Sequence, residues 1–332
     1  MTAPRFFTYL GIALLTFLWL CFILSWTTIY KPEEIEYGIT FSKKQSQSLG
    51  LDWKQNYTAM LDELGVKKLR LPVYWDEVQP EPGRYDWTDL DWQVDEAEKR
   101  GVQLILTIGN RVPRWPECHL PNWTASSAQS ERQTATFEYI RETVARYRRN
   151  PSVIYWQVEN EPFLKYFGIC PPFDKDFLDK EIALVKSLDS RPIIITDSGE
   201  LSLWFPAAKR ADVFGSTMYL NTYSEHLKSY IRYPITPAFF RIKRNLANLF
   251  AYPQDWIVIE LQGEPWGKTA FQDLPQAERD RTMDIRKFEE INEFARQSGF
   301  RTMYWWGVEF WYWEKQRGND AYWLAAQKLF KQ

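Results

Sequence analysis

Val153–Glu161 reads Val-Ile-Tyr-Trp-Gln-Val-Glu-Asn-Glu and runs directly into Pro162. A second run, Trp256–Glu260, reads Trp-Ile-Val-Ile-Glu. Both are short apolar runs rich in β-branched residues, a pattern typical of strands buried on both faces in a parallel sheet. Each ends in a carboxylate, which packing in a core does not require. If both strands belong to one barrel, their carboxyl ends share a face, and Glu161 and Glu260 are expected to converge there.

The strand pattern recurs along the chain, with helical patterns in between. Candidate strands are 36–41, 68–73, 102–108, 153–158, 192–196, 213–216, 257–260 and 302–306. Helical patterns cover 53–64, 90–100, 131–149, 175–188, 279–297 and 321–330. This alternation predicts an α/β fold with a parallel sheet. The 332 − 35 = 297 residues after position 35 suit one (β/α)8 TIM barrel, whose usual size is about 250 residues.

Composition excludes some classes of partner and leaves others open. The chain has 332 residues, of which 25% are charged, with a formal net charge of −2, a balance that gives no indication of a nucleic-acid partner. Aromatic residues make up 17% of the chain. Aromatic rings pack on the apolar faces of sugars, so the excess suits a carbohydrate site, although an aromatic core explains it equally well.

The N-terminal stretch Phe6–Tyr30 carries no charge over 25 residues, which is long enough to cross a bilayer. A cleaved signal peptide is the alternative, but its apolar run would be shorter and would end in a small-x-small site. The sequence therefore predicts a signal anchor or transmembrane helix in residues 1–30, with the lipid bilayer as its partner. A short linker, 31–35, and a catalytic barrel, 36–332, are expected to follow.

Two features bear on the side of the membrane that holds the barrel. Arg5 precedes the apolar stretch, and Lys31 is soon followed by acidic residues, so the positive-inside bias leans towards a cytoplasmic N-terminus. Cys118 and Cys170 lie in proline-rich loop sequence and are disulfide candidates, as an oxidising compartment permits. Two unrelated free thiols are the alternative. We expect a single-pass cell-membrane protein with its barrel on the extracytoplasmic side.

Several catalytic systems lack their parts in this sequence. The chain has two histidines and no His-Glu-x-x-His, phosphate loop or Gly-x-Ser-x-Gly motif. Zinc hydrolysis, nucleotide chemistry and serine hydrolysis are therefore not indicated, and we expect neither a metal nor a cofactor. Carboxylate chemistry remains, and two facing carboxylates are the groups that cleave glycosidic bonds.

Asn160-Glu161-Pro162 at the end of the fourth predicted strand, with Glu260 at the end of the seventh, resembles the clan A (4/7 superfamily) glycoside hydrolases, retaining enzymes built on (β/α)8 barrels. The longer stretch Trp156–Glu161 resembles the acid/base strand of families 35 and 42, the β-galactosidase-like members. Leu69–Trp87 is similar to the second strand and loop shared by families 5, 39 and 42. The resemblance covers about residues 36–330 and implies an oligosaccharide or polysaccharide substrate.

The resemblance implies a role for each matching position. Glu161 would be the acid/base and Glu260 the nucleophile that forms a glycosyl-enzyme. Asn160 would bind the 2-hydroxyl of the sugar. Arg70 would keep the nucleophile charged, and Tyr219 would touch it.

Other positions leave alternatives open. Trp305 or Trp306 would form the floor of the sugar site. Trp115 is either a platform for a further sugar or a loop-packing residue, and the same holds for Trp266 and Trp311. Arg70 could instead be a structural ion-pair partner, and Tyr219 a core residue.

Two further glutamates rival the predicted pair. Glu159 alternates to the opposite side of its strand from Asn160, and Glu264 lies four residues beyond Glu260 in a loop, so strand-tip geometry favours Glu260. The leading hypothesis is a membrane-anchored retaining glycoside hydrolase acting on β-linked sugars. A non-catalytic glycan-binding barrel and an envelope polysaccharide-assembly or transglycosylase factor are the alternatives.

Overall fold

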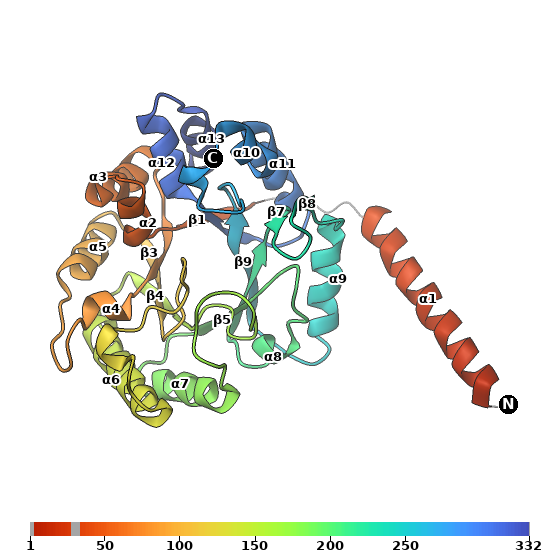
Figure 1. Ribbon diagram of the computed structural model, residues 1–332, viewed down its shortest axis with the longest axis horizontal. Helices are drawn as coiled ribbons and strands as arrows, with labels where there is room; N and C mark the ends of the chain where they lie inside the picture. The colour runs from red at the N-terminus through yellow and green to blue at the C-terminus, as the bar shows by residue number, and fades with distance from the viewer. Residues whose placement is uncertain (1–2, 28–33, 332) are drawn as a thin grey trace.

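The computed structural model describes residues 3–27 and 34–331 of the chain. In this part, eight parallel strands close into a barrel in the order β1-β10-β9-β6-β5-β4-β3-β2 (Figure 1). The barrel strands are β1 (Glu36–Thr40), β2 (Lys68–Pro72), β3 (Gln103–Ile108), β4 (Val153–Val158), β5 (Ile193–Asp197), β6 (Val213–Met218), β9 (Asp255–Gln262) and β10 (Thr302–Trp306). Each overlaps a predicted strand, and the (β/α)8 barrel is confirmed.

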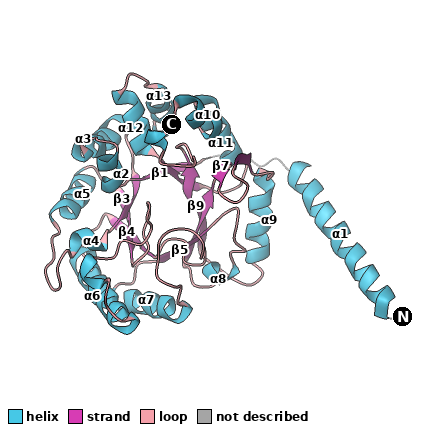
Figure 2. Ribbon diagram, viewed as in Figure 1, coloured by secondary structure: helices cyan, strands magenta, loops and turns pink. Residues whose placement is uncertain are grey.

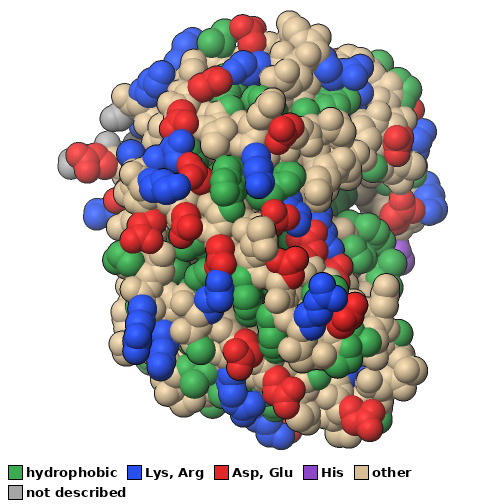
Figure 3. Space-filling view, turned by 90° about the vertical axis from the view of Figure 1, so that its left-hand side faces the viewer, with side chains coloured by type: hydrophobic (Ala, Val, Ile, Leu, Met, Phe, Trp, Pro, Cys, Tyr) green, Lys and Arg blue, Asp and Glu red, His purple; other side chains and the backbone are tan. Residues whose placement is uncertain are grey.

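Helices surround the ring of strands, as Figure 2 shows. The longer ones are α3 (Trp53–Ala59), continued by a π-helical turn (Met60–Leu64), α5 (Thr88–Lys99), α6 (Gln129–Tyr147), α7 (Lys175–Leu188), α9 (Pro237–Ala247), α10 (Gln276–Thr282), α11 (Ile285–Arg296), α12 (Val308–Gln316) and α13 (Ala321–Phe330). Shorter helices are α2 (Lys43–Ser48), α4 (Trp75–Val78) and α8 (Phe205–Ala208). Acidic and basic side chains are interspersed over the face in Figure 3, in keeping with the small net charge.

The strands bury both faces, which explains their apolar runs. One cluster of side chains fills the barrel interior, and a larger one lies between the strands and the helices. The interior cluster consists of Ile105, Ile194, Val213, Ile257, Ile259 and Tyr304. Gly38 makes room for it, because a Cβ at that position would lie 2.6 Å from the ring of Tyr304.

Two details differ from the sequence-based expectation. A hairpin, β7 (Asn221–Ser224) paired with β8 (Ser229–Arg232), follows β6 and was not predicted. The helix predicted over 279–297 is divided into α10 and α11. The chain is extended at Met283, and the side chain of Asp284 caps α11 by accepting a hydrogen bond from the backbone of Lys287, so a new helix begins there.

The N-terminal helix α1 (Ala3–Thr27) extends away from the barrel in Figure 1. Across residues 3–27 and 34–331, no helix combines the length and the apolar character needed to cross a bilayer. The predicted transmembrane signal anchor is therefore not supported. The last part of the predicted span, 28–30, and most of the predicted linker, 31–33, lie outside the described residues.

Candidate active site

The two predicted carboxylates lie at the carboxyl ends of β9 and β4. Glu260 belongs to β9 and pairs in register with Thr217 of β6, and Glu161 follows the end of β4 by three residues. Both are buried, with 4% of Glu260 and 6% of Glu161 exposed. They lie close enough for the charge of Glu260 to raise the pKa of Glu161. The barrel therefore brings together two residues that are far apart in sequence.

Glu260 is held by two donors. Arg70, which is fully buried on β2, donates from Nη1 to Oε1 of Glu260 at 2.8 Å. The hydroxyl of Tyr219 lies 3.1 Å from Oε2. Arg70 also donates to Gln157 and to Asn160, each at 2.7 Å. These contacts fix the orientation of the Glu260 carboxylate within the barrel.

Local contacts after β6 fix the position of Tyr219. Its backbone N–H donates to the side chain of Glu200 at 2.7 Å. The next two N–H groups, of Leu220 and Asn221, donate to the side chain of Gln262 at 2.9 and 3.0 Å. Because Gln262 lies two residues beyond the predicted nucleophile on β9, the same strand carries the nucleophile and orients its tyrosine.

Glu161 has a different environment. Its backbone N–H donates to Thr196 at 2.8 Å, but no described residue donates a hydrogen bond to its carboxylate. Burial raises its pKa well above the usual value, and the negative charge of Glu260 raises it further, while Arg111 opposes the shift. Its φ of 44° lies in a region that non-glycine residues seldom adopt. Burial and the neighbouring carboxylate therefore favour the protonated form of Glu161.

Asn160 and Glu159 point in different directions, although both lie just beyond the end of β4 and Glu159 has a φ of 58°. Asn160 lies in the centre, where its Oδ1 accepts from Arg70. Glu159 turns outward, and its carboxylate accepts the backbone N–H groups of Asn110 and Arg111, both at 2.7 Å. Glu159 therefore anchors the loop after β3 and takes no place beside Glu161.

Glu264 belongs to a separate charged cluster at the mouth of the barrel. Trp306 donates from its indole N–H to Glu264 at 2.7 Å. Arg114 pairs with Glu264 through Nη1 and with Glu309 through Nη2, the latter at 2.6 Å. The guanidinium of Arg114 also lies 4.0 Å from the centroid of the Trp306 ring. Glu264 is thus paired with Arg114 and Trp306, whereas Glu260 is paired with Arg70 and Tyr219.

The predicted tryptophans divide between the site and the core. Trp306 faces the mouth, whereas Trp305 faces the helices, where its ring stacks on Phe288 at 4.5 Å. Trp305 is fully buried and cannot be the floor of a sugar site. Trp115 is 63% exposed in the loop after β3, which leaves its ring free to contact a ligand.

An aromatic row links the loops that surround the centre. The ring of Trp266 lies 5.3 Å from that of Tyr219. Phe167, in the loop after β4, lies 5.6 Å from Trp266 and 6.1 Å from Trp115. The loops after β3, β4 and β9 therefore meet at the carboxyl ends of the barrel strands.

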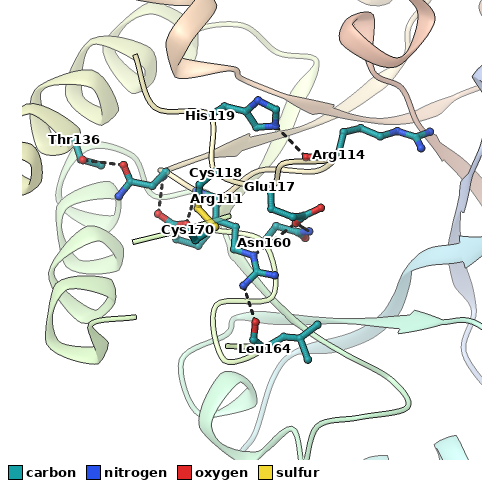
Figure 4. Close-up of a disulfide and its surroundings, with 11 residues drawn as sticks. Arg111, Arg114, Glu117, Cys118, His119, Thr136, Asn160, Leu164 and Cys170 are labelled. Atoms are coloured by element: carbon teal, nitrogen blue, oxygen red, sulfur yellow. Dashed lines mark hydrogen bonds and ion pairs between the residues drawn. A yellow bond between two sulfur atoms is a disulfide. The ribbon is translucent and has the colours of Figure 1, made fainter. Parts of the chain in front are cut away.

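Cys118 and Cys170 form a disulfide between the loops after β3 and β4, with their Cα atoms 5.2 Å apart (Figure 4). It lies beside Glu117, a buried carboxylate that accepts a hydrogen bond from Asn160 at 3.1 Å. Sequence reasoning missed Glu117, although the loop sequence Arg-Trp-Pro-Glu-Cys contains it. It also missed Arg114 in the same loop.

No cluster of three or more His, Cys, Asp or Glu side chains suited to a metal ion occurs in the described residues. Burial lowers the pKa of His119 to about 4, and its ring nitrogens lie 3.0 Å from the carbonyl oxygen of Arg114 and 3.3 Å from Nζ of Lys44.

Comparison with known proteins gives a consistent class. A family model described as beta-galactosidase matches residues 46–189, which is less than half of the chain. The β-galactosidase BgaA of Clostridium cellulovorans is 24% identical over 84% of this chain and 45% of its own length. A probable mannan endo-1,4-beta-mannosidase A-1 of Aspergillus terreus is 31% identical over 31% of this chain and 28% of its own. The chain thus spans less than half the length of these curated relatives.

Solved structures share the fold. A β-galactosidase from Rahnella sp. R3 superposes with a TM-score of 0.60 at 12% identity, covering 91% of this chain and 56% of that one. A GH5_18 protein from Streptomyces cattleya in complex with GlcNAc gives a TM-score of 0.58 at 14% identity, covering 84% and 71%. At these identities the likeness establishes the barrel architecture alone.

The family model, the relatives and the fold together support a clan A glycoside hydrolase, the class that the sequence resembles. Within that class, the matches reported above are the beta-galactosidase family model, two β-galactosidases, one mannan endo-1,4-beta-mannosidase and a GH5_18 protein.

Proposed function

We propose that this protein is a retaining β-glycosidase in which Glu161 is the acid/base and Glu260 the nucleophile. The observation that carries the proposal is the contrast between the two carboxylates. Arg70 and Tyr219 both donate to Glu260, whereas burial and the charge of Glu260 raise the pKa of Glu161. Neighbouring carboxyl groups whose environments differ in this way suit opposite roles in acid–base chemistry.

The proposed reaction has two steps. In the first, Glu260 attacks the anomeric carbon and forms an ester, while Glu161 gives its proton to the departing glycosidic oxygen. In the second, the ionised Glu161 takes a proton from water, and the resulting hydroxide displaces Glu260 from the anomeric carbon. Configuration at that carbon is inverted twice and so retained, and both carboxyl groups return to their starting states.

Arg70 and Asn160 support this chemistry. Arg70 stays paired with Glu260 at 2.8 Å before the ester forms and receives the carboxylate again when it is released. Arg70 also donates to Asn160 Oδ1, which fixes the amide beside the sugar position. Trp306, held by Glu264 and Arg114, supplies a rigid ring at the mouth for the apolar face of the substrate.

The assignment is tested by removing each carboxylate and adding azide. Glu161→Ala should lose most turnover, and azide should restore it with a glycosyl azide of retained configuration, because the small anion enters where the acid/base stood. Glu260→Ala should be rescued with the opposite configuration. Glu264→Ala is the matched variant, since it removes a buried glutamate from the same strand end. An inverted azide product from Glu264→Ala, with none from Glu260→Ala, would assign the nucleophile to Glu264.

We further propose β-linked oligosaccharides or polysaccharides as the substrate class. Support comes from the printed activities of the relatives, a β-galactosidase and a mannan endo-β-mannosidase, and from the exposed ring of Trp115. Turnover of 4-nitrophenyl β-galactoside, β-glucoside and β-mannoside, followed by β-linked polysaccharides, would identify the sugar. Cleavage of α-glycosides alone would contradict the proposal.

We also propose that the barrel works in an extracytoplasmic, oxidising compartment. The disulfide between Cys118 and Cys170 supports this, because such bonds persist outside reducing compartments. Mass spectrometry of protein unfolded in the alkylating reagent without a reductant should find neither cysteine modified. Both thiols alkylated in protein taken directly from cells would count against the compartment.

A further inference from the structure

The loop after β3 brings a third carboxylate to the catalytic centre. Glu117 is only 3% exposed, and its Oε2 lies 3.1 Å from Nδ2 of Asn160 and 3.6 Å from Nε of Arg111. Its charge reaches both catalytic residues: the charge of Glu260 raises the pKa of Glu117, and that of Glu117 raises the pKa of Glu161. The reaction proposed above gives this carboxylate no role.

The backbone around Glu117 aims its side chain inward. Glu117 has a φ of 74°, a conformation that a side-chain-bearing residue keeps only when its surroundings enforce it. Its N–H donates to the carbonyl of Arg114 at 2.7 Å, and its carbonyl accepts from Val112 at 2.9 Å. The next residue, Cys118, is tied to the loop after β4 by the disulfide, and Figure 4 shows Glu117 next to Asn160.

Close packing from the loop after β4 completes the support. A Cβ added to Gly168 would lie 2.8 Å from Cβ of Glu117, so the glycine backbone passes directly against this side chain. The N–H of Ile169 donates to the carbonyl of Pro116 at 2.9 Å. Two loops therefore hold one buried carboxylate that no packing role requires.

The contacts of Asn160 fix which end of its amide faces Glu117. Oδ1 accepts from Arg70 at 2.7 Å and from Gln157 at 3.2 Å, so Nδ2 must be the end that faces the glutamate. Nδ2 carries two hydrogens, of which Glu117 accepts one. A hydroxyl placed at this point can accept the second hydrogen and donate its own to the carboxylate, which is the complete pairing for one O–H group.

We propose that Glu117 contacts the substrate and, with Asn160, selects a sugar that carries a free hydroxyl next to its anomeric carbon. The inference rests on the proposed function and on the role that the family resemblance implies for Asn160, which is to bind that hydroxyl. A 2-deoxy sugar leaves the second hydrogen of Asn160 Nδ2 without an acceptor. A 2-acetamido sugar places an amide nitrogen there, which donates but does not accept, so the same hydrogen stays unpaired. A site built to pair a hydroxyl discriminates strongly against analogues without it.

The test compares matched 2-hydroxy and 2-deoxy substrates. The 4-nitrophenyl β-galactoside, β-glucoside and β-mannoside are screened, and kcat/KM for the best is divided by that of its 2-deoxy counterpart. Glu117→Met, similar in size but without an acceptor, should lower this ratio by about tenfold to a hundredfold, the range for one hydrogen bond to a charged group. Glu117→Gln keeps an acceptor oxygen and should retain more of the ratio. The exposed-residue control Glu225→Gln should leave both rates unchanged.

The possible results separate the two proposals. If Glu117→Met lowers both rates by the same factor, the residue supports the loop and does not contact the hydroxyl, and the inference fails. If Glu117→Met does not fold, as judged by tryptophan fluorescence, the ratio of kcat/KM for the 2-hydroxy and 2-deoxy substrates is measured in Glu117→Gln. A ratio equal to that of the wild type overturns the inference. A lower ratio supports it. A wild-type protein that cleaves none of the β-glycosides, mono- or polysaccharide, refutes the proposed function itself.

Discussion

Replacing Arg70 tests whether the ion pair with Glu260 organises the centre. Arg70 is fully buried and makes three hydrogen bonds, to Gln157, Asn160 and Glu260, at 2.7, 2.7 and 2.8 Å. Arg70→Met keeps an unbranched apolar stem but removes the guanidinium, and so leaves the carboxylate of Glu260 buried without its cation. Removing one partner of a buried pair costs about 3–5 kcal/mol, so the free energy of unfolding should fall by that amount.

The size of the ion-pair contribution follows from a second background. In Glu260→Gln no charge is left unpaired when Arg70 is removed, so Arg70→Met should cost only the lost hydrogen bonds to Gln157 and Asn160, about 1–3 kcal/mol. The coupling between the two positions should therefore be about 2 kcal/mol. Urea denaturation followed by tryptophan fluorescence measures all four proteins, and the chain contains 17 Trp. A coupling below about 0.5 kcal/mol would refute the ion pair as the organising contact.

Three further outcomes are expected. Because burial raises the pKa of Glu161 in the folded state, its ionisation destabilises the folded protein as the pH rises above the ordinary glutamate pKa. Glu161→Gln should therefore be more stable than the wild type at about pH 8, and this difference should be gone at about pH 3. A pH-independent difference in urea denaturation would contradict this. Tyr219→Phe removes the hydroxyl that lies 3.1 Å from Glu260 and keeps the ring contact with Trp266. The value of kcat/KM should fall about tenfold to 150-fold. An unchanged kcat/KM would show that the hydroxyl is not needed. Replacing Cys118 and Cys170 together by Ser should lower the free energy of unfolding by about 4 kcal/mol, the loop-closure entropy expected for a separation of 52 residues. A loss below about 1 kcal/mol would mean that other contacts hold the two loops together.

The barrel strands could be predicted because their signal is local. Each is a short apolar run flanked by sequence with helical periodicity. Burial on both faces leaves a continuous run of apolar residues in the sequence. The strand β4 begins and ends where its run predicts, at Val153–Val158. The hairpin of β7 and β8 escaped prediction because Asn221–Ser224 is polar and half of it is only partly buried, so it lacks that run.

The residues of the candidate site could likewise be predicted only where the sequence signal is local. Glu161, Glu260 and Asn160 stand at strand ends, where a polar residue interrupts an apolar run and is easily noticed. Glu117 and Arg114 lie in a loop whose course depends on a disulfide and on positive φ angles at both residues, and no periodic pattern encodes that course. The same limit applies to Trp305 and Trp306, since adjacent residues on a strand face opposite sides and the sequence does not say which side is inward.

The disulfide between Cys118 and Cys170 joins the loops after β3 and β4, and the backbone of Gly168 packs directly against Glu117. The two loops therefore form one structural unit, which can be exchanged only as a whole. Grafting either loop alone from another barrel would leave one cysteine without its partner. A graft of the loop after β4 would in addition place a side chain at position 168, where only glycine fits against Glu117. Engineering a new sugar preference into this scaffold therefore calls for transplanting both segments at once. In a homologous barrel, a gain of one cysteine in either loop is expected to accompany a matching gain in the other.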